Sequence, residues 1–228
     1  MTSRAIKIIE TTTLIAVPVA LFACAYFQWE ASALLMLAVV LAGLIIFFIS
    51  YEKSKPSLRQ ILPAGVLAAL AAAGRILFVY PGGFQPVSAI CIVAGVVFGK
   101  RTGFMVGALA AFVSNFFLGQ GPWTPWQMYA WGMIGYVAGI IADHGFFKKP
   151  IALYAYGFFA SLCYGFLLNT WYLVGFINPI TWQSALTVYG AGFVFDAVHA
   201  LSTIMFLLII YQPWRKKLER IKTKYDFK

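Results

Sequence analysis

The sequence predicts an all-α fold, a polytopic bundle of transmembrane helices. Of the 228 residues, 62% are hydrophobic and 11% are charged, and the mean hydropathy is +0.84. A soluble domain is closer to half apolar and a quarter charged. Long apolar runs recur from residue 11 to residue 212, and about 20 apolar residues are enough to cross a bilayer. Basic residues gather between these runs, as they do in cytoplasmic loops.

Eight apolar segments are expected to form helices. The fourth is short for a full crossing and is expected to be tilted or partly buried among its neighbours. The start of the chain has a basic front and an apolar run, as a signal peptide does. Its apolar part is too long and shows no small-residue cleavage site, so we expect a retained first span. The segments are 12–29, 32–51, 60–79, 86–99, 102–118, 126–142, 150–168 and 186–211.

The net charge of +10 is explained by membrane topology. With the N-terminus placed inside, all but one of the 17 Lys and Arg residues fall in cytoplasmic pieces, and Arg75 is the exception. This distribution predicts a multi-pass protein of the cell membrane with both termini in the cytoplasm. The basic tail, 213–228, is expected to lie on anionic lipid. The charge therefore does not indicate a nucleic-acid partner.

Catalytic and nucleotide-binding motifs are not found in the sequence. The segment "AGVVFGKR" (94–101) has Ala94 and Arg101 where a phosphate-binding loop needs Gly and Ser or Thr. The two histidines, His144 and His199, belong to no HExxH motif, and the three cysteines lie in apolar runs. We therefore expect no enzyme activity, no metal and no cofactor, and any use of ATP must depend on a partner.

Three predicted outer loops combine aromatic rings, amides and helix breakers, and none contains Lys, Arg, Asp or Glu. They are "YPGGFQPVS" (80–88), the stretch 114–132 and "NTWYLVGFINPITWQS" (169–184). Aromatic residues also collect at headgroup level in an ordinary interfacial belt. The accompanying amides favour a small-molecule site. Its candidate residues are Phe84, Gln85, Asn115, Gln120, Trp123, Trp126, Gln127, Tyr129, Trp131, Asn169 and Trp171.

Arg75 and Asp196 are ionisable residues inside predicted spans. Such residues normally face the bundle interior and find partners. We expect a buried ion pair between them, and Arg75 is also a candidate for ligand contact. His199 lies one helical turn from Asp196 and is expected to donate a hydrogen bond to Asp196 or to a backbone carbonyl.

The predicted helix 60–79 has two rows of small side chains. Ala64, Ala68 and Ala72 recur every four residues, and Gly65, Ala69 and Ala73 form a second row beside them. Small-xxx-small rows allow membrane helices to approach closely. They serve either packing within the bundle or contact with another membrane protein.

These features resemble the substrate-binding S component of an energy-coupling factor (ECF) vitamin transporter. The resemblance rests on the Ala64-x-x-x-Ala68-x-x-x-Ala72 row and on "PVSAICIVAGVVFGKRTGFMVGALAAFVSNFF" and "GPWTPWQMYAWG". It implies a six-helix core at 60–212, two additional N-terminal spans within 1–59, and the basic tail. It also implies that the alanine row docks on a transmembrane coupling subunit, and that two cytosolic ATPases drive release.

The implied substrate is a vitamin captured outside the cell. The resemblance is greatest to the cobalamin-specific type, and the charge-free aromatic loops suit a bulky ligand. Riboflavin or a queuosine precursor fits the same loops. A self-sufficient secondary transporter is the main alternative, although coupling-ion ligands or inverted repeats are not evident. A membrane enzyme and a purely structural partner are the others.

Overall fold

The computed structural model describes residues 3–29, 31–80 and 82–224, with side chains from residue 8 onward. Lys228 and the rest of the last four residues, within the predicted tail, lie outside this part. The described chain contains eight α-helices, one short 3-10 helix and no strand. They are α1 (Ser3–Phe27), α2 (Ser32–Lys53), α3 (Leu58–Leu77), α4 (Val87–Phe98), α5 (Lys100–Leu118), α6 (Thr124–Asp143), η1 (Phe146–Lys148), α7 (Pro150–Phe176) and α8 (Trp182–Lys224).

The predicted all-α fold is confirmed, and each of the eight predicted segments corresponds to one helix. Six helices, α1, α2, α3, α5, α7 and α8, are long and apolar enough to cross a membrane. The chain is thus a multi-pass membrane protein. Helix α4 has only 12 residues and is almost wholly buried, as expected for a short segment enclosed by its neighbours. Helix α6 has 20 residues and is long enough to cross a membrane, but it is not among these six because its Gly, Trp and Tyr residues contribute little hydropathy.

Two helices extend well beyond their predicted C-terminal ends. Helix α7 continues to Phe176, so Asn169 and Trp171 lie on a helix and not in a loop. Helix α8 continues through Pro213 to Lys224, so the described part of the basic tail is helical. At 43 residues, α8 is about 65 Å long at 1.5 Å per residue, which exceeds the hydrocarbon core of about 30 Å.

The centre of the bundle is formed by α4, α5 and α6, which approach one another through glycine. A Cβ atom on Gly95 or Gly103 would meet the backbone oxygen of Gly135. In lipid, such close backbone approach is a main source of helix association. Any larger side chain would separate these helices. The glycines thus allow three helices of uneven length to share one core.

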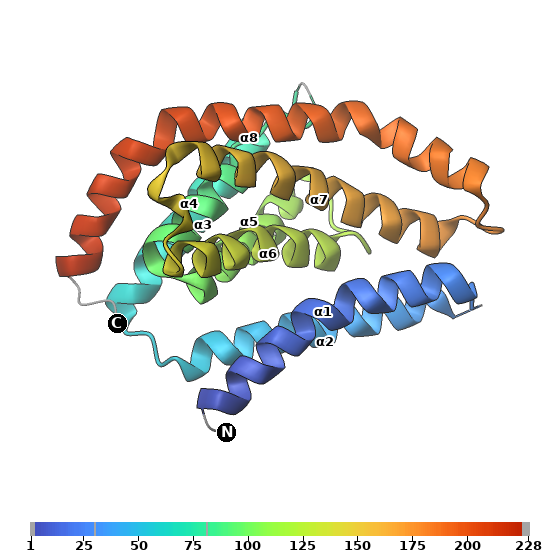
Figure 1. Cartoon of the computed structure of the whole chain (residues 1–228), viewed down its shortest axis with the longest axis horizontal. Helices are drawn as coiled ribbons and strands as arrows, with labels where there is room; N and C mark the ends of the chain where they lie inside the picture. Colours follow the sequence, from blue (N-terminus) through green and yellow to red (C-terminus); the bar gives the residue numbers. More distant parts are fainter. Residues whose placement is uncertain (1–2, 30, 81, 225–228) are drawn as a thin grey trace.

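The two N-terminal helices run together along one side of the bundle, and α7 and α8 cover another side (Figure 1). A cluster of buried side chains, including Met36 and Val40 of α2 with Phe104 of α5, joins this N-terminal pair to the core. The start of α1 and the end of α8 lie at the same end of the bundle, which we call the terminal end. The opposite end, the distal end, carries the α1–α2 and α7–α8 connections.

Candidate substrate site

Arg75 lies in the last turn of α3, where uncharged acceptors surround its guanidinium. Nη1 donates to Ser114 Oγ at 2.7 Å and to Asn115 Oδ1 at 2.6 Å. Nη2 donates to Gln127 Oε1 at 3.3 Å. The guanidinium carbon lies 4.8 Å from the centroid of the Trp131 ring. A cation inside the bundle is thus held by hydroxyl and amide oxygens and by one aromatic face, an arrangement that stabilises it without a second charge.

The amides around Arg75 continue as a network between α5 and α6. Asn115 Nδ2 donates to Thr124 Oγ1 at 2.9 Å and to Gln127 Oε1 at 2.8 Å. Thr124 in turn donates to Gln120 Oε1 at 2.9 Å. Asn115, Gln120 and Gln127, which the sequence placed around one loop, therefore belong to one hydrogen-bonded cluster. We call Arg75 and these polar partners the Arg75 network.

Beside this network, four aromatic and polar side chains pack in contact. The Trp131 ring stacks on Tyr164 with centroids 4.6 Å apart, and its Nε1 donates to Ser88 Oγ at 3.2 Å. Ser88 Oγ also lies 2.8 Å from His199 Nε2. The expected bond from His199 to Asp196 or to a backbone carbonyl is therefore wrong, because Nε2 meets Ser88 and Nδ1 has no hydrogen-bond partner in the described structure. Ser88 provides the partner because α4 is packed directly against this part of α8.

Asp196 has a different neighbour from the one expected. Its Oδ2 accepts a hydrogen bond from Asn169 Nδ2 at 2.8 Å, which joins α7 to α8. A Cβ at Gly165 would overlap the Asp196 carboxylate, so glycine makes room for it. Arg75 and Asp196 form no ion pair in the described structure. The expectation is corrected because α5 and α6 supply neutral partners for Arg75, whereas Asp196 faces α7.

The connection between α3 and α4 packs into the bundle. Ser202 Oγ lies 3.3 and 3.4 Å from the backbone oxygens of Gly83 and Gln85. Gly83 has φ +88° and lies against the Phe195 backbone, where a side chain would not fit. Gln85 is buried, and the Phe84 ring packs against Phe206 with centroids 5.3 Å apart. Phe84 and Gln85 thus cover α8.

The remaining aromatic candidates divide into two groups. Trp126 and Tyr129 are buried between α6 and the N-terminal pair, and the Trp126 ring packs against Trp171 with centroids 6.4 Å apart and planes at 26°. Trp123 and Gln120 are exposed at the α5–α6 connection. The candidates therefore do not line a single surface: Trp131 faces the Arg75 network, and Trp126 and Tyr129 face the N-terminal pair.

Three of these residues carry buried polar atoms without a hydrogen-bond partner. They are Trp126 Nε1, Tyr129 OH and His199 Nδ1, and the fourth such atom in the described chain is Ser32 Oγ. Leaving a buried polar group unpaired costs about 1–3 kcal/mol, and such groups in native structures call for an explanation. Groups of this kind are available to bond a ligand or an ordered water.

A cavity of about 320 Å³ lies between α1, α6 and α7. Tyr129, Tyr164 and Met133 line it, and Leu14 and Pro18 of α1 close one side. Tyr164 also stacks on Trp131, so its ring separates the cavity from the Arg75 network. The volume lies at the lower end of the range of roughly 300–1,000 Å³ found for small-molecule sites.

The predicted docking row lies inside the bundle. Ala64, Ala68 and Ala72 are each 3% exposed, and Ala64 and Ala68 pack in the core cluster that includes α4 and α5 side chains. Their assignment as an accessible docking face is therefore corrected. The second row, Gly65, Ala69 and Ala73, is exposed. Both rows satisfy the same four-residue repeat, and α3 turns the first one toward its neighbours.

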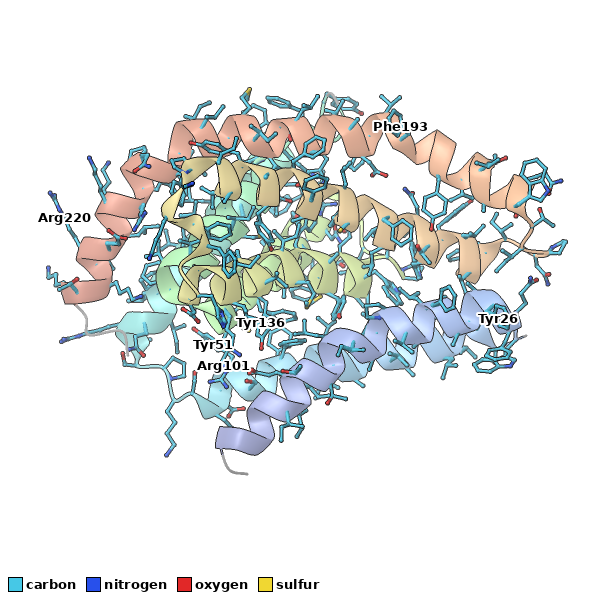
Figure 2. The ribbon with its side chains drawn as sticks, in the orientation of Figure 1. Tyr26, Tyr51, Arg101, Tyr136, Phe193 and Arg220 are labelled. Atoms are coloured by element: carbon cyan, nitrogen blue, oxygen red, sulfur yellow. The ribbon has the colours of Figure 1, made fainter. Side chains whose placement is uncertain are left out.

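Glu10, which was not among the residues singled out from the sequence, lies in α1 and is 0% exposed. Its carboxylate accepts hydrogen bonds from Arg101 Nε at 2.7 Å, from Tyr136 OH at 2.8 Å and from the Ser50 hydroxyl, and Lys100 Nζ lies 3.2 Å away. Arg101 and Tyr136 lie close together where the N-terminal pair meets the core (Figure 2). One carboxylate thus connects α1 with α2, α5 and α6. One feature of the sequence could have identified Glu10: it is the single acidic residue before position 30.

Comparison with known proteins agrees with this architecture. A family model described as "ECF-type riboflavin transporter, S component" matches residues 55–216, which contain α3–α8 almost entirely. No curated protein matched the chain significantly, and neither did any solved structure. The N-terminal pair lies outside the matched range. The chain therefore belongs to the family of S components of ECF transporters, the membrane subunits that bind the substrate of these transporters.

Proposed function

We propose that this chain captures riboflavin outside the cell and delivers it together with a transmembrane coupling subunit and two cytosolic ATPases. The observation that carries the proposal is the set of buried polar atoms on Trp126, Tyr129 and His199 that have no hydrogen-bond partner in the described structure. A bound molecule that supplies the missing partners would remove this cost. A vitamin with both a flat ring and polar edges meets this requirement.

Riboflavin suits the chemistry of the site. Its ring system is flat and uncharged, and it carries carbonyl oxygens and ring nitrogens. The 320 Å³ cavity beside Tyr129 and Tyr164 has room for one such ring system. Movement of the Tyr164 ring would connect the cavity with the amides of the Arg75 network. These groups would then provide both a stacking surface and hydrogen bonds.

Cobalamin remains a second candidate. The observation that favours it is that the stretches 80–88, 114–132 and 169–184 contain no Lys, Arg, Asp or Glu. A large neutral ligand is held mainly by contact area. The cavity volume favours the smaller ring system of riboflavin. A corrinoid requires a larger rearrangement of α6 and α7.

The delivery step requires an accessible surface on α3. Gly65, Ala69 and Ala73 form an exposed strip of small side chains, and a Cβ on Gly65 would meet nothing within 4 Å. Another membrane helix can approach such a strip closely. In our proposal, this strip contacts the coupling subunit in the cell membrane, and both termini lie in the cytoplasm. The basic residues at the terminal end agree with that orientation.

The proposal is tested by uptake of radiolabelled riboflavin in cells that produce this chain. Uptake should require the coupling subunit and both ATPases, whereas binding by the purified chain should not require ATP. The absorbance spectrum of the protein as purified provides a second reading, since a flavin is yellow and a corrinoid is pink. A corrinoid spectrum with no riboflavin uptake would transfer the function to cobalamin. Binding of neither vitamin would contradict both candidates.

A further inference from the structure

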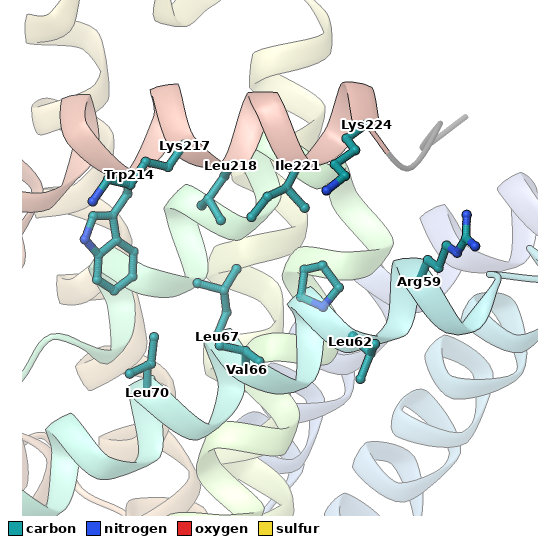
Figure 3. Close-up of a pocket in the computed structure, with 11 residues that line it drawn as sticks. Arg59, Leu62, Val66, Leu67, Leu70, Trp214, Lys217, Leu218, Ile221 and Lys224 are labelled. Carbon is teal, nitrogen blue, oxygen red and sulfur yellow. The ribbon is translucent and has the colours of Figure 1, made fainter.

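A second hollow lies at the terminal end of the bundle. It is a groove of about 740 Å³ between the first half of α3 and the last turns of α8. Leu62, Val66 and Leu70 form the α3 wall, and Trp214 and Leu218 form part of the α8 wall (Figure 3). Leu62 and Val66 are 58% and 57% exposed, so the groove opens along an apolar surface.

The end of α8 has the sequence of an interfacial helix. Pro213 lies inside α8, and proline removes a backbone hydrogen bond and bends a helix. Figure 1 shows that α8 bends near its end. After the proline, Trp214, Leu218 and Ile221 follow one another by four and three residues, so they share one helix face. That face lines the groove, and the other positions of 214–224 are polar, most of them Lys or Arg.

The charge of the groove has one sign. Arg59, Lys217 and Lys224 line it, and no acidic side chain does. These basic side chains lie beside apolar lining residues. The groove therefore suits a molecule that has both an anionic group and an apolar part. Amphipathic helices with basic polar faces bind anionic lipid surfaces in this way. The membrane itself supplies that molecule without any further protein.

We propose that this groove binds one anionic phospholipid, with its phosphate at Lys217 and an acyl chain along Leu62, Val66 and Leu70. The lipid lies next to the exposed strip of Gly65 and Ala69 on the same helix. A coupling subunit that docks on this strip therefore meets the lipid as part of the surface. The proposal extends the predicted contact of the basic tail with the bilayer to a defined site, and it does not depend on the identity of the vitamin.

The test measures lipid retention by the purified full chain. The protein is placed in nanodiscs of dioleoylphosphatidylcholine with a small fraction of dioleoylphosphatidylglycerol, then released and analysed by native mass spectrometry. We expect one retained phosphatidylglycerol. Lys217→Glu should reduce its retention about tenfold, because each basic residue near an anionic surface contributes measurably to binding. Lys216→Glu is the matched control, because Lys216 is exposed and does not line the groove.

A second variant separates binding in the groove from general attraction to the basic helix. Val66→Trp fills the groove without changing charge and should remove the retained lipid, while the thermal midpoint and vitamin binding stay unchanged. Equal losses with Lys216→Glu and Lys217→Glu, or retention undiminished by Val66→Trp, would overturn the proposal. So would a wild-type chain that retains no phosphatidylglycerol. If Lys217→Glu then blocked assembly with the coupling subunit, the groove would be a protein-docking site.

Discussion

Arg75 Nη1 lies 2.6 Å from Asn115 Oδ1, a hydrogen bond that joins the last turn of α3 to the end of α5. The same amide binds Gln127, so one asparagine connects three helices around a single cation. Hydrogen bonds to charged groups contribute about 1.5–3 kcal/mol each. The proposed vitamin site therefore has one polar centre, and removing it should lower the affinity for the vitamin.

We expect Asn115→Ala to weaken riboflavin binding by at least about tenfold, since losing one charge-assisted hydrogen bond corresponds to about 1.4 kcal/mol or more. Fluorescence titration of the purified variant measures this loss. Gln183→Ala is the control, because Gln183 is an exposed amide at the start of α8. Equal affinity of Asn115→Ala and the wild type would exclude the Arg75 network from binding.

Tyr129→Phe should leave the empty protein at least as stable as the wild type and should reduce its stabilisation by riboflavin. The hydroxyl is buried without a partner, so its removal should raise the thermal midpoint of the empty protein or leave it unchanged. The increase in midpoint on adding riboflavin should become smaller. Tyr172→Phe, at an exposed position of α7, should change neither value. A lower midpoint for empty Tyr129→Phe would mean that the hydroxyl already has a role in folding.

The two small-residue rows of α3 should respond differently to the same change. Ala69 is exposed, so Ala69→Trp should leave vitamin binding intact and block assembly with the coupling subunit. Ala68 is 3% exposed, so Ala68→Trp should overpack the core and reduce the yield of folded protein. Co-purification of the subunits and the thermal midpoint separate the two effects. Normal assembly of Ala69→Trp would remove the exposed row from the docking surface.

Glu10→Gln should loosen the N-terminal pair from the core. The carboxylate is fully buried and meets Lys100, Arg101, Ser50 and Tyr136, so loss of its charge should cost about 1–3 kcal/mol and lower the thermal midpoint. Glu219→Gln is the matched control, because its pair with Arg215 is exposed and such pairs contribute little. A midpoint equal to that of the control would show that apolar packing alone holds α1 and α2.

The helices were predictable because the apolar runs and the basic segments between them can be read directly from the order of residues in the sequence. The position of each helix followed from apolar length, and the short, enclosed α4 followed from its 12–14 apolar residues. The gathering of Asn115, Gln120 and Gln127 was also predictable, since they belong to one short stretch between two helices. These features depend on local sequence.

Partner choice was not predictable in the same way. Arg75 and Asp196 are the two ionisable residues noted inside spans, yet Arg75 meets amides and Asp196 meets Asn169. The rotation of α3 decides which small-residue row is buried, and it is set by α4 and α5 and not by the four-residue repeat. Glu10 acquires its role only from residues 40 to 126 positions away. Each of these depends on how distant helices pack.

The most direct test of the account is titration of the purified chain with riboflavin and, in parallel, with cobalamin, in the absence of ATP and of any partner. We predict saturable, one-to-one quenching of flavin fluorescence that is weakened by Asn115→Ala and unaffected by Gln183→Ala. If riboflavin did not bind, or if it bound equally well to both variants, the assignment of the vitamin site to the Arg75 network and its neighbouring cavity would be contradicted.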